Sequence, residues 1–267
     1  MEKIFLTGAS SGIGLAIARA LVARGHEVWG TSRDPERIPA LRGLHPLHLD
    51  LADPRSVDEA FNAALTEADH FDVLINNAGS GHFGPAESLS QESIADQFQV
   101  LLFGHLQLMR LAINGMQARG EGLIINVTSL ASRLPVPFMA AYNAAKAAMA
   151  AFTMSIQLEL PDSKVRIVDL QPGDICTAFN DAVVKSSQCD PRYEAKLAKT
   201  WEAVDRNMKA APTPDLVAKH ILKVIDATNP PPRVTVGDTF QTKIAPLIFG
   251  FLPQRVRIWG LKKYYGI

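Results

Sequence analysis

The stretch Thr7-Gly8-Ala9-Ser10-Ser11-Gly12-Ile13-Gly14 decides the fold of this chain. It joins an apolar run at residues 3–6 to residues 12–24, whose apolar positions recur at helical spacing. Glycine tolerates positive φ and lets the backbone approach a ligand closely, while the first turn of a helix presents free N–H groups and a positive dipole end to an anion. Between a strand and a helix, such a loop predicts a site for the pyrophosphate of a dinucleotide, with an ordinary tight turn as the alternative.

Beyond this loop, apolar runs alternate with helical patterns. We expect strands at residues 27–31, 45–51, 72–76, 122–128, 165–171 and 233–236, and helices at residues 54–68, 90–118, 142–160 (ended by Pro161) and 213–227. Runs such as Val73-Leu74-Ile75 are apolar on both faces, as in a parallel sheet covered by helices. The pattern predicts an α/β fold, a Rossmann-type doubly wound parallel sheet in a single domain over residues 1–267, with ligands bound where the strands end.

Composition limits the classes of partner and location. The 27 basic and 27 acidic residues balance, which gives no case for nucleic acid as a partner. Cys176 and Cys189 are too few for a disulfide framework and favour a reducing, cytoplasmic location, with a single bridge left open. No apolar run approaches the roughly 20 residues of a membrane span, the N-terminal run is too short for a signal peptide, and no metal ion is expected.

The end of the second expected strand indicates which dinucleotide binds. An NAD site usually places an acid there, whereas an NADP site places a basic group for the 2′-phosphate. The segment here is Thr31-Ser32-Arg33-Asp34, and Arg33 can offer two parallel N–H groups to a phosphate. We therefore expect NADP(H) in preference to NAD(H), the alternative being a surface Arg33 paired with Asp34 or Glu36.

Two further strand ends carry candidate cofactor contacts. Asp50, followed by Leu51, could accept a hydrogen bond from the adenine amino group or could cap its own turn. Asn77, Ala78 and Gly79 follow the fourth expected strand, where their size allows close contact with a ribose or with the neighbouring loop. Within the first loop, the candidate contacts are Gly8, Ser10, Ser11, Gly12, Ile13 and Gly14.

A candidate acid/base group lies near the fifth expected strand. Tyr142 and Lys146 are four residues apart on an expected helix, which places them on one face. A phenol has a pKa of about 10, and a neighbouring ammonium group lowers it. Ser129, just after the strand, could donate a hydrogen bond to a substrate oxygen. Tyr-x-x-x-Lys alone is common on helices, so its value depends on Ser129 and the glycine loop in the same chain.

Together these motifs resemble those of the short-chain dehydrogenase/reductase family, in its shorter branch of roughly 250 residues. The resemblance is close for residues 1 to about 180 and loose beyond. It rests on the glycine spacing of the first loop, Asn76-Asn77-Ala78-Gly79, Ser129, Tyr142-x-x-x-Lys146, and Pro172-Gly173 with Thr177 beyond.

The resemblance implies a role for each of these residues. Tyr142 would be the general acid/base, Lys146 would lower its pKa and hold the nicotinamide ribose, and Ser129 would polarise the carbonyl. Pro172, Gly173 and Thr177 would line the nicotinamide end. The implied reaction interconverts an alcohol with a ketone or aldehyde, and family members are usually dimers or tetramers.

One position departs from the family pattern. Members of this branch usually carry an asparagine in the long helix, where it ends a water relay from the lysine, and the spacing places it at Leu101. A leucine side chain makes no hydrogen bond, so the relay would depend on the backbone carbonyl at that point or on His105, one turn further.

The resemblance also divides the chain. Residues 1–173 would form the cofactor-binding and catalytic core, residues 174–211 a substrate lid, and residues 212–267 a C-terminal lobe. The lid residues Phe179, Val183 and Val184 could cover an apolar substrate or pack among themselves, and residues 134–139 are apolar as well. These features favour a hydrophobic substrate: a steroid-like, retinoid-like or long-chain carbonyl.

The tail, residues 243–267, alternates apolar and aromatic residues with basic ones. An oligomer contact, a pocket wall, a membrane-surface contact and plain packing against the core all fit this pattern.

Two other function classes compete with an active NADP(H)-dependent oxidoreductase. A non-catalytic dinucleotide sensor or scaffold on the same fold is favoured only by Leu101, because Ser129, Tyr142 and Lys146 are all present. A nucleotide-sugar epimerase or dehydratase would have a longer chain and another glycine spacing. A kinase or NTPase is excluded because no Gly-Lys-Ser/Thr follows the loop.

Overall fold

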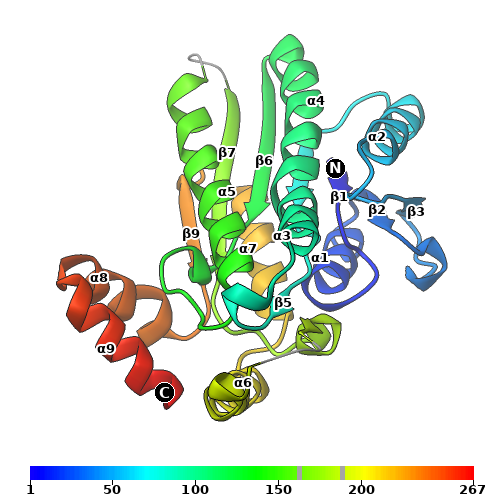
Figure 1. Cartoon of the computed structure of the whole chain (residues 1–267). Coiled ribbons are helices and arrows are strands. Elements are labelled where there is room, and N and C mark those ends of the chain that lie inside the picture. The colour runs from blue at the N-terminus through cyan, green and yellow to red at the C-terminus, as the bar shows by residue number, and fades with distance from the viewer. Residues whose placement is uncertain (161–163, 187–189) are drawn as a thin grey trace.

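A parallel sheet forms the centre of the molecule (Figure 1). The computed structural model describes residues 1–160, 164–186 and 190–267. The strands of the sheet are β1 (Lys3–Leu6), β2 (Glu27–Ser32), β3 (Leu44–His48), β4 (Val73–Asn76), β6 (Glu121–Val127), β7 (Lys164–Pro172) and β9 (Arg233–Val236). They lie in the order β3-β2-β1-β4-β6-β7-β9, with every pair parallel. The expected Rossmann-type doubly wound sheet in a single domain is thereby confirmed.

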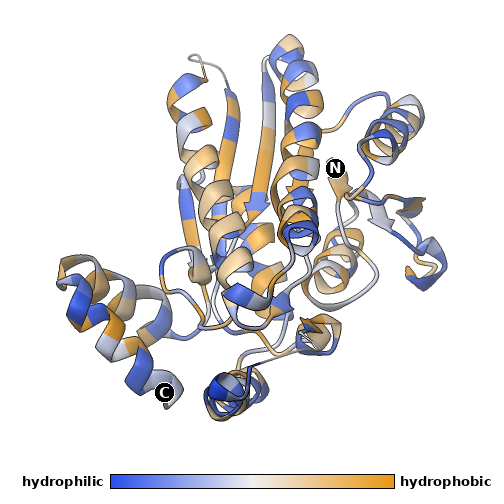
Figure 2. Cartoon of the chain, in the orientation of Figure 1, coloured by the Kyte–Doolittle hydropathy of each residue, from blue (hydrophilic) through white to orange (hydrophobic). Residues whose placement is uncertain are grey.

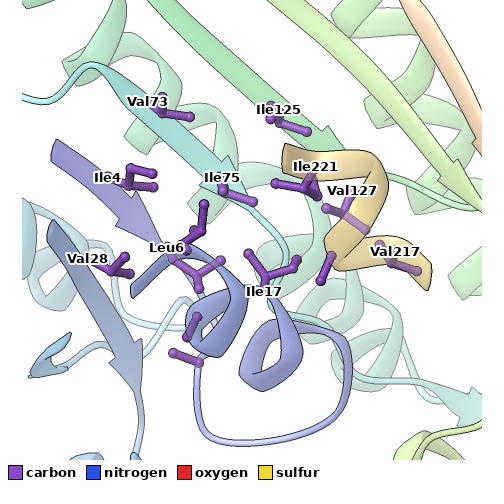
Figure 3. Packing of buried hydrophobic residues seen from close by; sticks show 14 of the residues in the cluster. Ile4, Leu6, Ile17, Val28, Val73, Ile75, Ile125, Val127, Val217 and Ile221 are labelled. Atoms are coloured by element: carbon purple, nitrogen blue, oxygen red, sulfur yellow. The ribbon is translucent and has the colours of Figure 1, made fainter. Parts of the chain in front are cut away.

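Helices cover both faces of the sheet because its strands are apolar on both sides. Ile4 and Leu6 of β1 point to one face, where they pack against α1 (Gly12–Ala23) and α7 (Asp215–Asp226). Figure 3 shows this layer of aliphatic side chains between the strands and the two helices. Phe5 points to the opposite face, among residues of three other helices: α2 (Pro54–Ala68), α4 (Gly104–Arg119) and α5 (Ala140–Glu159).

The strand order places the functional residues. From β1 the chain passes outward to β2 and β3 and then returns to the other side of β1 as β4, so the winding reverses between β1 and β4. The carboxyl ends of these two strands border the crevice in which such sheets bind ligands. The loop at residues 7–14 and the residues after Asn76 therefore lie side by side.

The expected strand at residues 45–51 was wrong at both ends. β3 runs from Leu44 to His48, as the last strand at one edge of the sheet. Pro46 lacks an N–H group, which an edge strand tolerates. The N–H group of Leu49 still donates to Ser32 O, at 3.0 Å, but the chain then turns away.

The expected single helix at residues 90–118 was also wrong in detail. It consists of α3 (Gln91–Phe98), a π turn at Gln99–Phe103, and α4. A Cβ atom on Gly104 would lie 2.8 Å from the carbonyl oxygen of Leu51, so this helix approaches the chain after β3 at close range. Apolar periodicity does not report the extra residue of a π turn.

Two short strands connect the segment after β4 to the chain beyond β7. β5 (His82–Phe83) pairs in parallel with β8 (Val184–Lys185). The chain continues with α6 (Pro191–Ala210) and, after α7 and β9, with a π turn at Phe240–Ile244, α8 (Ala245–Phe251) and α9 (Gln254–Tyr265). Pro161 and Cys189 lie outside the described residues. In the described segments, no helix is long and apolar enough to cross a membrane.

Candidate active site

Two glycines of the loop at residues 7–14, hereafter the glycine loop, leave no room for a side chain. Gly8 has φ +75°, and a Cβ atom there would lie 2.9 Å from Ala78 Cα. A Cβ atom on Gly14 would collide with the carbonyl oxygen of Gly8. The backbone of the loop is thus in direct contact with the end of β4, as the motif predicts.

Hydrogen bonds from Thr7 and Asn77 hold the loop against β4. Thr7 Oγ1 accepts from the N–H groups of Asn77 and Ala78, at 2.8 and 3.0 Å. The side-chain amide of Asn77 donates to Thr7 O, at 2.9 Å. Of the two possibilities left open for residues 77–79, contact with the neighbouring loop is the one that the structure shows.

The start of α1 has the properties of an anion site. Ser11 is its N-cap residue, but its side chain makes no capping hydrogen bond, so the first N–H groups of the helix keep their capacity to donate. These groups, with the close-packed glycines beside them, fit the diphosphate of a dinucleotide. The residues that would hold it are those of the glycine loop.

The end of β2 carries small hydroxyl groups beside an exposed arginine. Ser32 Oγ donates to Ser10 Oγ, at 3.2 Å, which links this strand end to the glycine loop. Arg33 is exposed, and within the described residues it forms no ion pair with Asp34 or Glu36. Its guanidinium group can therefore reach an anion bound next to Ser10 and Ser32.

Asp50 caps its own turn. Its Oδ1 atom accepts from the N–H group of Ala52, at 3.0 Å, while Leu51 is buried. The local capping that the sequence left as an alternative is present, and the outer oxygen of the carboxylate keeps room for a further donor.

Ser129 and Tyr142 lie close together. Ser129 follows β6 and is the N-cap residue of a 3₁₀ turn at Leu130–Ser132, where its Oγ atom accepts from Ala131 N, at 3.0 Å. Tyr142 lies in the first turn of α5, close enough to Ser129 for the serine hydroxyl to lower the pKa of the phenol. One helical turn on, Lys146 Nζ lies 6.0 Å from the centre of the Tyr142 ring. The three expected catalytic residues are thus brought together.

Burial controls the protonation of this group. It raises the pKa of the Tyr142 phenol, and the hydrogen bond from Ser129 partly opposes the rise. Burial also lowers the pKa of Lys146 to about 8, against the attraction of Asp169. Lys146 Nζ donates to Val127 O, at 2.8 Å. At neutral pH the phenol is therefore a proton donor, and the lysine is mostly charged.

Asp169 is a functional candidate that sequence reasoning missed. It is buried in the middle of β7, where it accepts from Thr128 Oγ1 and, at 2.9 Å, from Arg233 Nε of β9. Thr128 precedes Ser129, so this carboxylate fixes the strand end that carries the serine. A charged residue inside a run that is otherwise apolar on both faces was the signal that could have found it.

The position of the usual asparagine is filled by a packed leucine. Leu101 is fully buried in the π turn, and a Cβ atom on Gly79 would lie 3.2 Å from its Cδ2 atom. His105, also buried, places Nδ1 3.5 Å from Leu101 O and Nε2 3.2 Å from Thr7 Oγ1. Burial, with the Lys146 charge nearby, lowers the pKa of His105 to about 3, so the imidazole is neutral.

Of the residues expected at the nicotinamide end, Thr177 lies next to the glycine loop, and Gly173 is paired with β9. The N–H group of Gly173, which follows Pro172 at the end of β7, donates to Val236 O, at 2.8 Å. Thr177 caps a 3₁₀ turn through Phe179 N, at 3.2 Å. A Cβ atom on Gly12 would lie 3.6 Å from Thr177 Cβ, so the chain after β7 passes over the start of α1.

Beside Tyr142 lies an aromatic cluster drawn from separate segments. Its members are Phe83, Val136, Phe138, Met139, Tyr142, Phe179, Val183, Leu197 and Trp201. The ring centres of Tyr142 and Phe179 are 5.8 Å apart. Val184, also expected to face the substrate, instead forms β8 and is exposed. The Tyr142 phenol therefore borders an apolar region built from the chain after β4, α6 and residues 136–139.

Asn143 fixes one side of this cluster, a role that sequence reasoning also missed. Its Nδ2 atom donates to Val136 O, at 2.8 Å, and its Oδ1 atom accepts from Val136 N, at 3.3 Å. In the part of the chain that is described, no group of three or more His, Cys, Asp or Glu residues could hold a metal ion.

The family model described as short chain dehydrogenase matches residues 2–188. The chain belongs to the short-chain dehydrogenase family. As a member of this family, it is an oxidoreductase acting on CH–OH groups. The expected resemblance is thereby confirmed over the region that contains the glycine loop, Ser129, Tyr142 and Lys146.

Relatives match well beyond the family region. A 3-ketodihydrosphingosine reductase of Bacteroides thetaiotaomicron is 30% identical, over 100% of this chain and 98% of that protein. Retinol dehydrogenase 8 of Bos taurus is 29% identical, over 92% of this chain and 84% of that protein. A short-chain dehydrogenase structure from Streptomyces avermitilis has a TM-score of 0.82 and 27% identity, and the two chains cover each other to 98% and 96%. The lid segment and the tail thus fall within the aligned length.

Proposed function

We propose that this short-chain dehydrogenase is an NADP(H)-dependent enzyme that interconverts a hydrophobic alcohol and its ketone or aldehyde. One observation carries the proposal: Tyr142, a member of the aromatic cluster, lies close to Ser129, with Lys146 one turn further along the same helix. The acid Tyr142, the carbonyl-binding hydroxyl group of Ser129 and the apolar side chains of the aromatic cluster would then surround the carbonyl group of the substrate.

Reduction uses the protonation state that burial favours. When bound, NADPH supplies the hydride that adds to the carbonyl carbon. The Tyr142 hydroxyl gives its proton to the carbonyl oxygen, and the raised pKa of the phenol keeps that proton in place at neutral pH. Ser129 donates its hydroxyl hydrogen to the same oxygen, since its lone pair already accepts from Ala131 N. In oxidation, Tyr142 takes the proton back.

The proposed cofactor site follows the strand ends. The diphosphate lies on the glycine loop at the start of α1, the adenine half lies near Asp50 and Leu51, and Asn77, Ala78 and Gly79 contact a ribose. Lys146 holds the nicotinamide ribose, and Pro172, Gly173 and Thr177 line the nicotinamide end. Arg33 selects NADP(H), because it is exposed and directly follows Ser32, whose hydroxyl group is linked to Ser10 of the glycine loop.

The proposed substrate is a long-chain, retinoid-like or steroid-like carbonyl. Residues 174–211 act as its lid, through Phe179, Leu197 and Trp201. Two relatives are named for a ketodihydrosphingosine and for retinol, which supports a substrate of this kind. The aromatic cluster would exclude water from the reacting carbonyl.

Oligomerisation and location are part of the same proposal. Phe103 of the π turn and Phe152 and Leu158 of α5 are exposed apolar side chains on neighbouring helices, which supports a homodimer or homotetramer formed through this face. Cys176 is a free, exposed thiol, which supports a reducing, cytoplasmic location.

A cofactor titration with a carbonyl screen tests the proposal. We expect NADPH to bind more tightly than NADH, and turnover to rise with the chain length of the ketone. Tyr142→Phe should lower kcat by about a hundredfold to ten-thousandfold while leaving the NADPH affinity intact, because only the proton donor is lost.

A contrary result would favour another function. If NADPH binds but no carbonyl turns over, the protein is a dinucleotide sensor or scaffold, and Leu101 becomes the leading cause. If only small polar ketones turn over, the hydrophobic substrate is wrong.

A further inference from the structure

The C-terminal helices α8 and α9 project from the body of the molecule beside the substrate lid (Figure 1). Hydrogen bonds at the two ends of this segment attach it to the rest of the protein. Gln241 Nε2 donates to Asp174 Oδ2, at 2.7 Å, and Asn207 Nδ2 of α6 donates to Tyr264 OH, at 2.9 Å. Tyr265 is buried. The helix pair is thus anchored to the segment that follows Gly173 and to α6.

The outer side of the first helix is an apolar stripe. Ile244, Leu247, Ile248 and Phe251 follow the spacing i, i+3, i+4 and i+7, which places them on one helix face. All four are exposed, Leu247 to 63% and Phe251 to 84%. Scattered exposed apolar residues are ordinary, but a continuous stripe of large ones marks a surface that is covered in use.

The second helix adds an aromatic ring surrounded by positive charge. Trp259 is 62% exposed, and Lys263 Nζ lies 5.3 Å from the centre of its ring. Arg255 and Lys262 are exposed as well, on the same side of the helix. Figure 2 shows this mixture of hydrophobic and hydrophilic residues along α8 and α9. Aromatic and basic residues side by side are typical of a helix in the headgroup region of a bilayer.

Two occupants could cover this surface, a second copy of the protein or a lipid bilayer, and the charge of the surface favours the bilayer. After Asp238 the chain contains basic residues but no acidic one, although its total charge is zero. A second copy of the same surface would bring like charges together, which opposes self-association. An anionic lipid surface offers the opposite charge together with an apolar layer for Leu247, Phe251 and Trp259.

We propose that α8 and α9 dock this enzyme onto the surface of an anionic lipid bilayer. The apolar stripe of α8 and Trp259 enter the acyl boundary, and Arg255, Lys262 and Lys263 lie among the phosphate groups. Docking is peripheral. It would bring the lid next to a reservoir of hydrophobic carbonyl compounds, a consequence that rests on the proposed function, whereas the docking itself does not.

Vesicle flotation of the full chain tests the proposal. We expect the protein to float with vesicles of phosphatidylcholine and phosphatidylserine, to float far less with phosphatidylcholine alone, and to be released by high salt. Trp259 fluorescence should shift to the blue on binding, and the shift should be absent in Trp259→Ser.

Paired variants separate the two contributions. Leu247→Ser with Phe251→Ser should abolish flotation, and Lys262→Glu with Lys263→Glu should lower the partition coefficient by more than about tenfold. Leu41→Ser, at an exposed residue before β3, and Lys196→Glu with Lys199→Glu, at exposed residues on α6, are matched controls and should float as the wild type does. NADPH titration of every variant shows that the fold is intact.

Three outcomes would overturn the proposal. They are a wild type that stays unbound, tail variants that float like the wild type, and sedimentation showing a dimer that Phe251→Ser dissociates without any vesicle binding. The last would assign the surface to a second copy. Because flotation needs no turnover, an inactive enzyme that still floats refutes the proposed function alone.

Discussion

The glycine loop and the aromatic cluster both serve the proposed reaction, yet different forces hold them in place. At the glycine loop, Thr7, Asn77 and Ala78 are joined by hydrogen bonds of 2.8 to 3.0 Å, and glycines are packed too closely for any side chain. In the aromatic cluster, rings from separate segments touch through apolar surface, with ring centres 4.9 to 5.8 Å apart.

This difference indicates how each side responds to change. Hydrogen bonds are directional, so the loss of one partner leaves a buried polar group unpaired. Apolar contacts lose energy in proportion to the area removed, and the neighbouring side chains can adjust. We therefore expect substitutions on the polar side to damage stability or cofactor binding, and those in the aromatic cluster to change substrate preference.

The largest effect is expected at Asp169. Asp169→Asn should destabilise the fold by about 3 kcal/mol, at the lower end for a broken buried pair because the Arg233 side chain is 40% exposed. Urea unfolding measures this change. Asp226→Asn, which breaks an exposed pair with Arg24, is the matched control and should cost less than about 1 kcal/mol. If both variants lose the same free energy of unfolding, the buried hydrogen bonds of Asp169 contribute no more to stability than the exposed pair.

The next effect concerns the cofactor. Arg33→Ala should weaken NADPH binding by about tenfold to a hundredfold and leave NADH binding unchanged, because only the 2′-phosphate loses a charged donor. Fluorescence titration of both dinucleotides measures it, with Arg37→Ala, an exposed arginine nearby, as control. An equal loss for NADH would mean that Arg33 acts on the fold of the loop and not on the phosphate.

A third effect, the dependence of stability on pH, should distinguish the polar side of the site from the aromatic cluster. The pKa of His105 is lowered from 6.5 to about 3 in the folded protein. At a pH between these two pKa values, His105 binds more protons in the unfolded chain than in the folded protein. The free energy of unfolding therefore falls as the pH falls, by up to about 1.4 kcal/mol per pH unit. His105→Gln should reduce this slope in urea unfolding between pH 6.5 and 4. His220→Gln is the control, and an unchanged slope for His105→Gln would exclude His105 as the cause.

The smallest effect is expected in the aromatic cluster. Phe179→Ala should remove about 1 kcal/mol of contact with a long substrate, so the ratio of kcat/KM for long and short ketones should fall about fivefold. NADPH affinity and the midpoint of unfolding should change little. Phe152→Ala, on the outer side of α5, is the control. A loss of kcat for all ketones alike would place Phe179 in the alignment of Tyr142 and not in substrate selection.

Local patterns predicted most of the fold. Runs apolar on both faces, such as Val73-Leu74-Ile75, indicated buried parallel strands, and that run forms β4, paired with β1 and β6. The π turn at Gln99–Phe103 escaped prediction, because an added residue in a helix leaves apolar periodicity almost unchanged. The end of β3 at His48 escaped it because a strand ends where its partner diverges, which is a property of both segments.

By itself, the sequence determined the parallel sheet and the family, because apolar runs, glycine spacing and Tyr-x-x-x-Lys are short-range features. Only the tertiary structure decided that Asp169 lies under Thr128, that Asn143 clamps Val136, and that Leu101 packs on Gly79. It also decided that Phe251 is exposed and not buried. Burial and pairing between distant segments depend on the whole chain, so no local pattern contains them.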